Sequence, residues 1–204
     1  MDRSAAGIAR CIRLAREGQA DALGELLASY RNYLRLLAAT CIDGDVRGKA
    51  DASDVVQETL MKAHENFGTF RGTTELEWIA WVRQILVNNL ADLHRRFSLQ
   101  GRKISRERSL DAAMDRSSQM LRNLLPAHGP SPSQEMQQRE TSVILADALA
   151  ELEPEDREVI VLRNLQELDW NEISRRTGRS PDAARMLWTR ALQRVGGLLK
   201  GGMA

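Results

Sequence analysis

The most constraining segment of the sequence lies near its C-terminus and carries the start signals of two helices with a turn between them. Asp169, with Glu172 three residues later, has the capping-box pattern of a helix N-terminus. Gly178 stands where a short turn needs a left-handed residue. The Ser-Pro-Asp sequence at residues 180–182 suits a second helix start, because serine caps, proline fits the first turn and aspartate favours the dipole. The pattern predicts a helix-turn-helix over residues 169–195.

The second helix of this motif is expected to have two different faces. Helical spacing predicts an inner face of Ala184, Trp188, Ala191 and Val195. The remaining face is polar and basic, and it comprises Asp182, Arg185, Met186, Thr189, Arg190 and Gln193. Such a helix after a tight turn can enter a DNA major groove, where Arg185 could contact a guanine edge and Thr189 and Arg190 could hold phosphates. A plain helical hairpin within a bundle remains the alternative.

The rest of the chain also favours helix. Only 4% of the 204 residues are aromatic, which argues against a sandwich or a barrel. Helical spacing recurs in two N-terminal stretches, Leu23, Leu26, Leu27, Tyr30, Leu34 and Leu37, and then Val55, Val56, Thr59, Leu60 and Ala63. We therefore predict an all-α fold with two small helical domains, a helical bundle and a DNA-binding domain of the winged-helix-like class that holds the helix-turn-helix.

A change of composition separates these domains. Residues 101–138 are rich in Ser and Gln and contain Pro126, Gly129, Pro130 and Pro132. Proline removes a donor and restricts its neighbour, so residues 127–133 are a poor place for a helix. A flexible linker is expected there, with room for one helix over residues 110–125. The expected domains are residues 1–100 and 139–204, joined by the linker 101–138.

Charge is distributed unevenly, although the net charge is only +1. Residues 95–108 and 175–194 are strongly basic, whereas acidic residues dominate between 51 and 77. This distribution suits a protein that meets DNA twice and a basic protein surface once. Solvated helix faces are the alternative interpretation of each segment taken alone.

Several function classes fit the sequence poorly. Cys11 and Cys41 match neither a disulfide framework nor a zinc pattern, and no stretch is apolar enough to span a membrane. Asp51, Asp54 and Glu58 have a spacing that could hold a metal, yet the three histidines are scattered and no phosphate-binding glycine loop is present. We expect a cytoplasmic protein without enzymatic activity, metal or other cofactor.

At this point the sequence resembles the extracytoplasmic-function (ECF) sigma factors, the promoter-reading subunits of RNA polymerase. Residues 149–199 are similar to region four of that family, and its characteristic positions are occupied by Ile173, Gly178, Ser180, Arg185, Arg190 and Ala191. Residues 22–34, residues 54–63 and the Phe-Arg-Gly sequence at 70–72 resemble region two. The order and spacing of both regions match.

The resemblance implies a docking helix for core polymerase. In the family, the helix that corresponds to residues 54–63 binds the clamp coiled coil of the largest subunit. The resemblance makes Asp54, Gln57, Glu58 and Arg71 candidate contacts, and Met61 shares the helix face of the first three. The implied partners are the clamp helices and flap of core polymerase and promoter DNA. Members of the family are also held by anti-sigma factors, so such an inhibitor is a further candidate partner.

The resemblance also implies a site for the minus-ten element within residues 81–96. Asn88 occupies the position that helps to form a pocket for a flipped base, and a carboxamide both donates to and accepts from a base edge. Trp78 or Trp81 could supply a wall of the pocket, although core packing is expected for Trp81. Arg95 and Arg96 would contact phosphates.

For the minus-thirty-five element, the candidate contacts are Arg179, Ser180, Asp182, Arg185, Met186, Thr189 and Arg190. Met186, Leu187 and Trp188 depart from the residue types usual in the family. The sequence thus predicts an ECF-type sigma factor. A stand-alone helix-turn-helix regulator is the alternative, but it leaves the acidic helix and the Asn88 segment without a role. An adaptor or anti-sigma protein would not explain a basic recognition helix.

Overall fold

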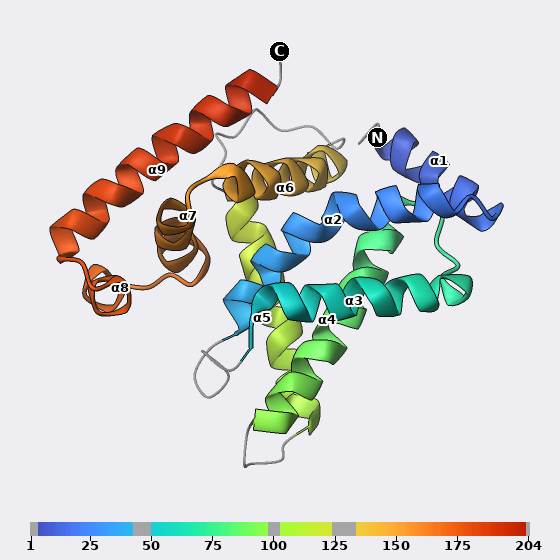
Figure 1. The fold of residues 1–204 in the computed structure, drawn as a ribbon, viewed down its shortest axis with the longest axis horizontal. Coiled ribbons are helices and arrows are strands. Elements are labelled where there is room, and N and C mark those ends of the chain that lie inside the picture. The colour runs from blue at the N-terminus through green and yellow to red at the C-terminus, as the bar shows by residue number, and fades with distance from the viewer. Residues whose placement is uncertain (1–3, 43–49, 98–102, 124–133, 203–204) are drawn as a thin grey trace. The chain divides into compact units, whose positions relative to one another are not determined.

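The computed structural model describes residues 4–42, 50–97, 103–123 and 134–202, and these form helices without any strand (Figure 1). The predicted all-α class is confirmed, and the helix-turn-helix has no β-wing within the described residues. The chain divides into two compact units, Met1–Met114 and Asp115–Ala204.

Unit 1 contains the N-terminal helices. They are α1 (Ala5–Arg16), α2 (Ala20–Cys41), α3 (Ala52–Glu65), the 3-10 turn η2 (Phe67–Thr69) and α4 (Glu75–Phe97). Helices α2 and α3 run side by side and α4 packs against both (Figure 1). The two predicted apolar stripes, from Leu23 to Leu37 and from Val55 to Ala63, are buried at every predicted position.

A buried polar contact joins α2 to α4 within this core. The Tyr30 hydroxyl donates to Oε1 of Glu75 at 2.7 Å, and both side chains are buried. Tyr30 also meets Trp78 edge to face, with ring centroids 6.5 Å apart. A carboxylate that loses water must be hydrogen-bonded, and the phenol supplies that bond.

Unit 2 contains the C-terminal helices. They are α6 (Gln134–Glu151), α7 (Pro154–Ile160), the π-helical turn η3 (Val161–Leu165), α8 (Trp170–Thr177) and α9 (Pro181–Gly202). Helices α6, α7 and α8 all pack against α9. Arg157 of α7 closes the end of α6, because its guanidinium donates to the carbonyls of Leu149, Ala150 and Leu152 at 3.0, 3.2 and 2.9 Å.

The predicted linker is partly helical. Helix α5 (Lys103–Asn123) extends seven residues ahead of the helix expected to start at 110, and the boundary between the two units falls within it. Helix α6 begins at Gln134, four residues before the predicted end of the linker. The proline-rich residues 127–133 lie outside the described residues, and the predicted domain bounds stay predictions.

No helix in the described ranges has both the length and the apolarity that crossing a membrane requires.

Candidate nucleic-acid interface and docking face

The helix-turn-helix forms as its capping signals predict. Oδ1 of Asp169 accepts from the N–H of Glu172 at 2.8 Å, and Oγ of Ser180 accepts from the N–H of Ala183 at 3.2 Å. Gly178, with φ of +67°, takes the left-handed conformation that ends α8. The carboxylate of Glu172 forms ion pairs with Arg175 and Arg176 at 2.6 and 3.0 Å. Of the two hydrogen bonds of a capping box, the one observed is therefore the one accepted by the Asp169 side chain.

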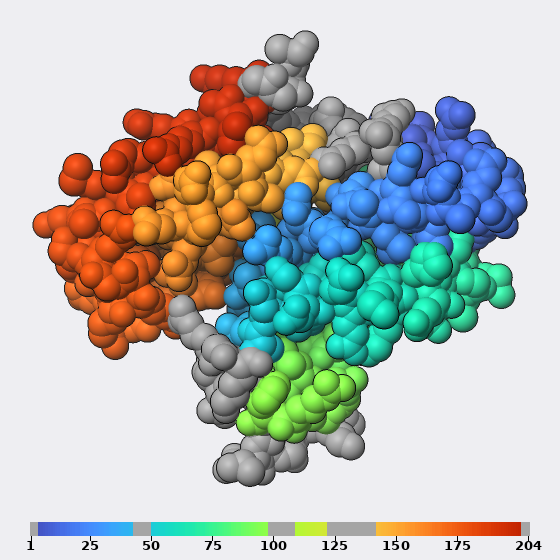
Figure 2. Space-filling model, in the orientation of Figure 1, coloured from blue at the N-terminus to red at the C-terminus, as the bar shows by residue number. Residues whose placement is uncertain are grey.

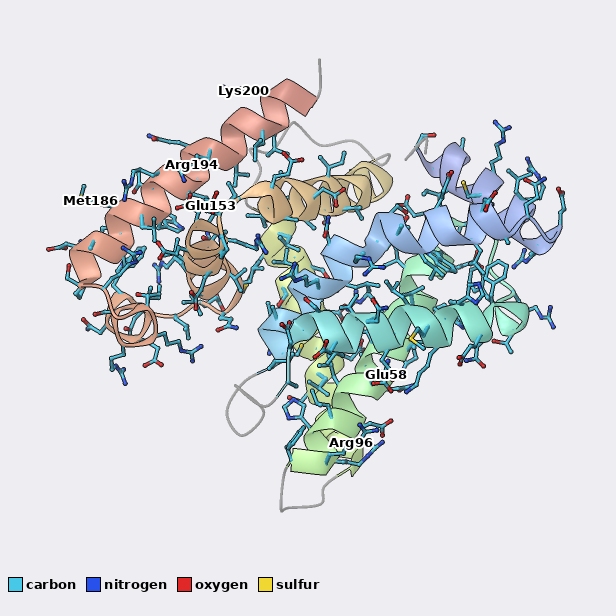
Figure 3. All side chains as sticks on the ribbon, viewed as in Figure 1. Glu58, Arg96, Glu153, Met186, Arg194 and Lys200 are labelled. Atoms are coloured by element: carbon cyan, nitrogen blue, oxygen red, sulfur yellow. The ribbon has the colours of Figure 1, made fainter. Side chains whose placement is uncertain are left out.

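The outer face of α9 carries most of the residues predicted to contact DNA. Asp182, Arg185, Met186, Thr189 and Arg190 are exposed there, and Met186 projects from the helix at 65% exposure (Figure 3). Nη1 of Arg185 donates to Oδ1 of Asp182 at 3.1 Å. The Thr189 hydroxyl donates to the backbone carbonyl of Arg185 at 3.0 Å.

Arg185 also contacts the preceding helix. Its guanidinium carbon lies 5.4 Å from the centroid of the Trp170 ring, and the guanidinium of Arg163 lies 5.0 Å from the same ring. Trp170 meets Trp188 edge to face at 5.7 Å. The sequence pattern does not predict these roles for Trp170 and Arg163, because a tryptophan in the first turn of α8 carries no signal of an arginine that lies fifteen residues further along the chain.

Arg179, in the turn between α8 and α9, has contacts through both its side chain and its backbone. Its guanidinium pairs with Glu155 of α7, and its carbonyl accepts from the Ser174 hydroxyl at 2.6 Å. Ser180, the next residue, is exposed but already caps α9. These contacts hold the turn between α8 and α9 in place.

The inner face of α9 differs from the prediction at one position. Ala184, Ala191 and Val195 are buried as predicted, but Trp188 is only half-buried and Leu187 is buried in its place, at 8% exposure. Leu187 and Trp188 differ in direction by about 100° and so lie on opposite sides of the stripe formed by Ala184, Ala191 and Val195. A small rotation of α9 against its neighbours decides which of the two side chains is covered. Trp188 keeps a polar anchor, since its Nε1 donates to Oδ1 of Asn164 at 2.7 Å. The apolar residue at 187 therefore belongs to the core.

The predicted docking face of α3 is exposed along its length. Asp54, Gln57, Glu58 and Met61 all face solvent, and Met61 is 56% exposed. Figure 2 shows α3 lying open beside α2, and Glu58 projects from α3 in Figure 3. Two cations border the face: Lys62 pairs with Glu58 at 2.8 Å, and Nη1 of Arg31 donates to Oε1 of Gln57 at 3.3 Å.

Arg71 lies on a turn that several contacts hold in shape. Nη2 of Arg16 donates to the carbonyls of Phe70 and Gly72 at 3.1 and 2.6 Å, so a side chain of α1 is hydrogen-bonded to the turn on both sides of Arg71. A Cβ at Gly72 would stand 2.5 Å from Cβ of Glu77, which makes glycine necessary there. Arg71 itself is exposed.

The start of α4 adds an electrostatic feature to this turn. Oε2 of Glu77 accepts from the N–H groups of Thr73 and Thr74 at 2.8 and 3.0 Å and from the Thr74 hydroxyl at 2.8 Å. These hydrogen bonds, first of all that from the Thr73 backbone, hold the pKa of Glu77 below its ordinary value. The carboxylate form thus anchors the helix start.

Two adjacent asparagines on α4 have different surroundings. Asn88 is exposed, and its Oδ1 accepts from Gln84 at 3.1 Å. Asn89 is 4% exposed: its Nδ2 donates to the Thr59 hydroxyl at 2.9 Å and its Oδ1 accepts from Lys62 at 2.5 Å. Asn89 joins α4 to α3, whereas the Asn88 carboxamide faces outward, as a base-contacting residue requires.

The prediction that Trp78 lines a DNA pocket needs correction. Trp78 is 0% exposed and is enclosed by the rings of Tyr30, Phe67, Phe70 and Trp81. A base cannot reach it in this structure. Trp81, for which core packing was expected, is half-buried, as is Phe67, and it retains surface.

Two arginines lie exposed near the end of α4, beyond Asn88 along the helix. Arg95 forms an ion pair with Asp92, one turn earlier. Arg96 lies in the last turn of α4 (Figure 3). Both residues predicted to contact phosphates are therefore accessible.

The acidic residues considered for a metal site have other surroundings. Oδ1 of Asp51 accepts from the N–H of Ser53 at 2.8 Å and so caps α3. Within the described ranges, no group of three or more His, Cys, Asp or Glu side chains is placed to hold a metal ion.

Comparison with known proteins gives two family matches at the two surfaces. The model of Sigma-70 region 2 matches residues 26–98, and that of Sigma-70, region 4 matches residues 142–195. The first contains all of α3 and α4, and the second contains the complete predicted helix-turn-helix, residues 169–195.

The chain is also similar over most of its length to named sigma factors. It is 29% identical to the ECF RNA polymerase sigma factor BldN of Streptomyces coelicolor, over 97% of this chain and 68% of BldN. It is 28% identical to the RNA polymerase sigma factor CarQ of Myxococcus xanthus, over 90% of this chain and 92% of CarQ. The ECF RNA polymerase sigma-E factor of Haemophilus influenzae is 27% identical, over 80% of this chain and 79% of that protein.

A solved structure of the RsbN–BldN complex contains a chain with 24% identity. The match covers 92% of this chain and 98% of that one, and the TM-score is 0.33.

Proposed function

Because the chain belongs to the sigma-70 family, in its ECF group, we propose that it binds core RNA polymerase and directs promoter-specific initiation of transcription. Unit 1 docks on the polymerase and reads and melts the minus-ten element, and α9 of unit 2 reads the minus-thirty-five element. The observation that carries the proposal is that an exposed acidic face on α3 and an exposed basic face on α9 occur in one chain.

The docking step is assigned to the face of Asp54, Gln57, Glu58 and Met61, together with the exposed Arg71. Carboxylates on a helix face complement a basic partner helix, and the exposed Met61 adds apolar area to the contact. Lys62 already pairs with Glu58, so a partner cation would compete with an exposed pair, which costs little to exchange. The polymerase clamp helices, and the flap for unit 2, are the proposed partners.

The minus-ten contacts are assigned to α4. Asn88 offers an exposed carboxamide to a flipped base, and the accessible edge of Trp81 replaces Trp78 as the wall on which the base stacks. Arg96 and Arg95 contact phosphates, and Arg95 exchanges its Asp92 partner for the DNA backbone.

The minus-thirty-five contacts are assigned to the outer face of α9. Arg185 is the base-reading residue, because a guanidinium can bind a guanine edge in a bidentate manner. Met186 suits an apolar contact, such as a thymine methyl group. Thr189 and Arg190 contact phosphates, and Arg179 and Ser180 hold the turn that faces the DNA backbone.

Two further points follow from this role. A sigma factor works with polymerase in the cytoplasm, which is where we place the protein. An anti-sigma factor that covers the two DNA-binding surfaces together would inhibit it, because both surfaces belong to one chain.

Run-off transcription with purified core polymerase tests the proposal. We expect promoter-specific transcripts only when the full chain is added, and tight promoter binding only by the joint complex. Absence of any specific product over a genomic promoter library would refute the sigma function.

The same assay separates the proposal from a stand-alone regulator. That alternative predicts tight binding of a palindromic operator by a dimer without polymerase. A matched variant, Glu58→Lys with Asp54→Lys, should abolish the polymerase complex in a native gel while leaving the protein folded, since both side chains are exposed.

A further inference from the structure

We propose that Trp170 and Asp182 together position the guanidinium of Arg185, so that discrimination at one base of the minus-thirty-five element depends on an indole that lies outside the recognition helix. The inference rests on the proposed function of α9. It adds a positioning residue on α8, and it gives Asp182 a role other than direct contact with DNA.

The geometry restrains Arg185 from two directions. The Trp170 ring, on α8, lies 5.4 Å from the guanidinium carbon, and Asp182, one turn earlier on α9, accepts from Nη1 at 3.1 Å. Arg185 nevertheless keeps 54% of its side chain exposed. A guanidinium has five N–H donors, and these contacts use one donor and a ring face, so donors remain for a base edge.

The indole is itself held firmly enough to act as a platform. The guanidinium of Arg163 lies 5.0 Å from the Trp170 ring, and Nη1 of Arg163 donates to the Leu168 carbonyl at 2.9 Å. On another side, Trp188 meets the ring edge to face at 5.7 Å and is anchored by Asn164. Arg163 and Asn164 both come from the π-helical turn η3, an uncommon backbone form that often marks functional sites.

Restraint of this kind favours base discrimination. A free arginine loses much conformational freedom when it binds, whereas one already held in place loses less and is offered in one orientation. Asp182 presents a further reason: its side chain is 88% exposed on the face that meets DNA, where an unpaired carboxylate would repel phosphates. Pairing with Arg185 offsets that repulsion, and the Asp182 carboxylate then orients the Arg185 guanidinium.

The test is the base preference of polymerase assembled with the full chain, measured by selection from promoters randomised over the minus-thirty-five element. Arg185→Ala should lower the preference at one base position by about tenfold. Trp170→Ala should lower it at the same position by about two- to fivefold, and Trp170→Phe should restore most of it, since phenylalanine keeps a π face. Arg190→Ala is the matched control and should weaken binding to all sequences alike.

Asp182→Asn provides a second variant that leaves the packing around Trp170 intact. Loss of preference at the Arg185 position supports the proposal. Loss at a different base position would overturn it, because Asp182 would then be contacting DNA directly. The proposal is also overturned if Trp170→Ala leaves the preference profile unchanged, or weakens all sequences equally with no rescue by Trp170→Phe. A wild-type complex that gives no specific transcript would instead refute the proposed function, so the two failures are distinguishable.

Discussion

The two helices proposed to contact DNA, α4 and α9, present their key side chains in different ways. On α4, Asn88 contacts Gln84 of its own helix, and the adjacent Asn89 is the residue tied to α3. On α9, Arg185 is itself held by Asp182 and by Trp170 of another helix. A residue that captures a base flipped out of a duplex needs access, whereas one that reads an intact groove gains from a fixed orientation. The supporting contacts differ accordingly.

The largest expected effect comes from removing Asn89, which joins α4 to α3. Asn89→Ala deletes two hydrogen bonds that are largely sheltered from water and should destabilise unit 1 by about 2–3 kcal/mol. Urea unfolding followed by circular dichroism measures the change. Asn88→Ala is the control and should alter stability by less than about 0.5 kcal/mol. Equal losses for the two variants would contradict the division of roles.

The corresponding deletion on α9 should affect recognition and spare stability. Arg185→Ala should reduce discrimination between the preferred base and its competitors by about 1–3 kcal/mol, because a bidentate base contact is lost. Competition binding with substituted promoters measures it. An unchanged base preference would move Arg185 to the phosphate-contacting group.

Asn88→Ala should slow promoter opening more than it weakens closed binding. The lost contacts form only after a base leaves the stack, so we expect about a tenfold effect on open-complex formation. Permanganate footprinting reports the open complex, and a gel shift under conditions that keep the duplex closed reports initial binding. Equal loss in both assays would refute the assignment.

The smallest expected effect concerns pH. The pKa of Glu77 is lowered in the folded protein below its ordinary value, first of all by the hydrogen bond from the Thr73 backbone, so the contribution of the carboxylate to stability is present above the ordinary pKa and is lost as pH falls through the lower folded pKa. Glu77→Gln should therefore flatten the acid limb of the stability curve of unit 1. A titration of thermal unfolding from pH 6 down to about pH 3 checks this, and an unchanged acid limb would contradict the role of the carboxylate.

Local signals in the sequence predicted much of the fold. The capping residues Asp169 and Ser180 and the left-handed Gly178 act over three or four residues, so their geometry follows from short-range hydrogen bonds and sterics. The apolar stripes of α2 and α3 were predicted correctly for a similar reason, because period and composition define an inner face along a long helix.

Candidate site residues were predictable to the extent that their exposure followed from such a pattern. The face of α3 that contains Asp54 and Glu58 is opposite a clear apolar stripe, and the structure leaves it open. Trp78 was predicted as a possible wall of a base pocket, and the structure buries it instead, because an indole suits a base-stacking wall and a core equally well. The position of η2 decides between a surface wall and the core, because it brings the rings of Phe67 and Phe70 against Trp78.

The sequence by itself determined where the two helices of the helix-turn-helix begin and where the turn lies between them, that the chain is all-α, and which short segments resemble sigma regions two and four. Only the tertiary structure decided that Asn89 and not Asn88 is buried, that Leu187 packs inward ahead of Trp188, and that Trp170 lies against Arg185. Neighbouring residues on a helix differ in direction by about 100°, so the sequence specifies their order around the axis. Which of them is covered depends on the angle at which another helix packs, and that angle is set by side chains far away in the chain.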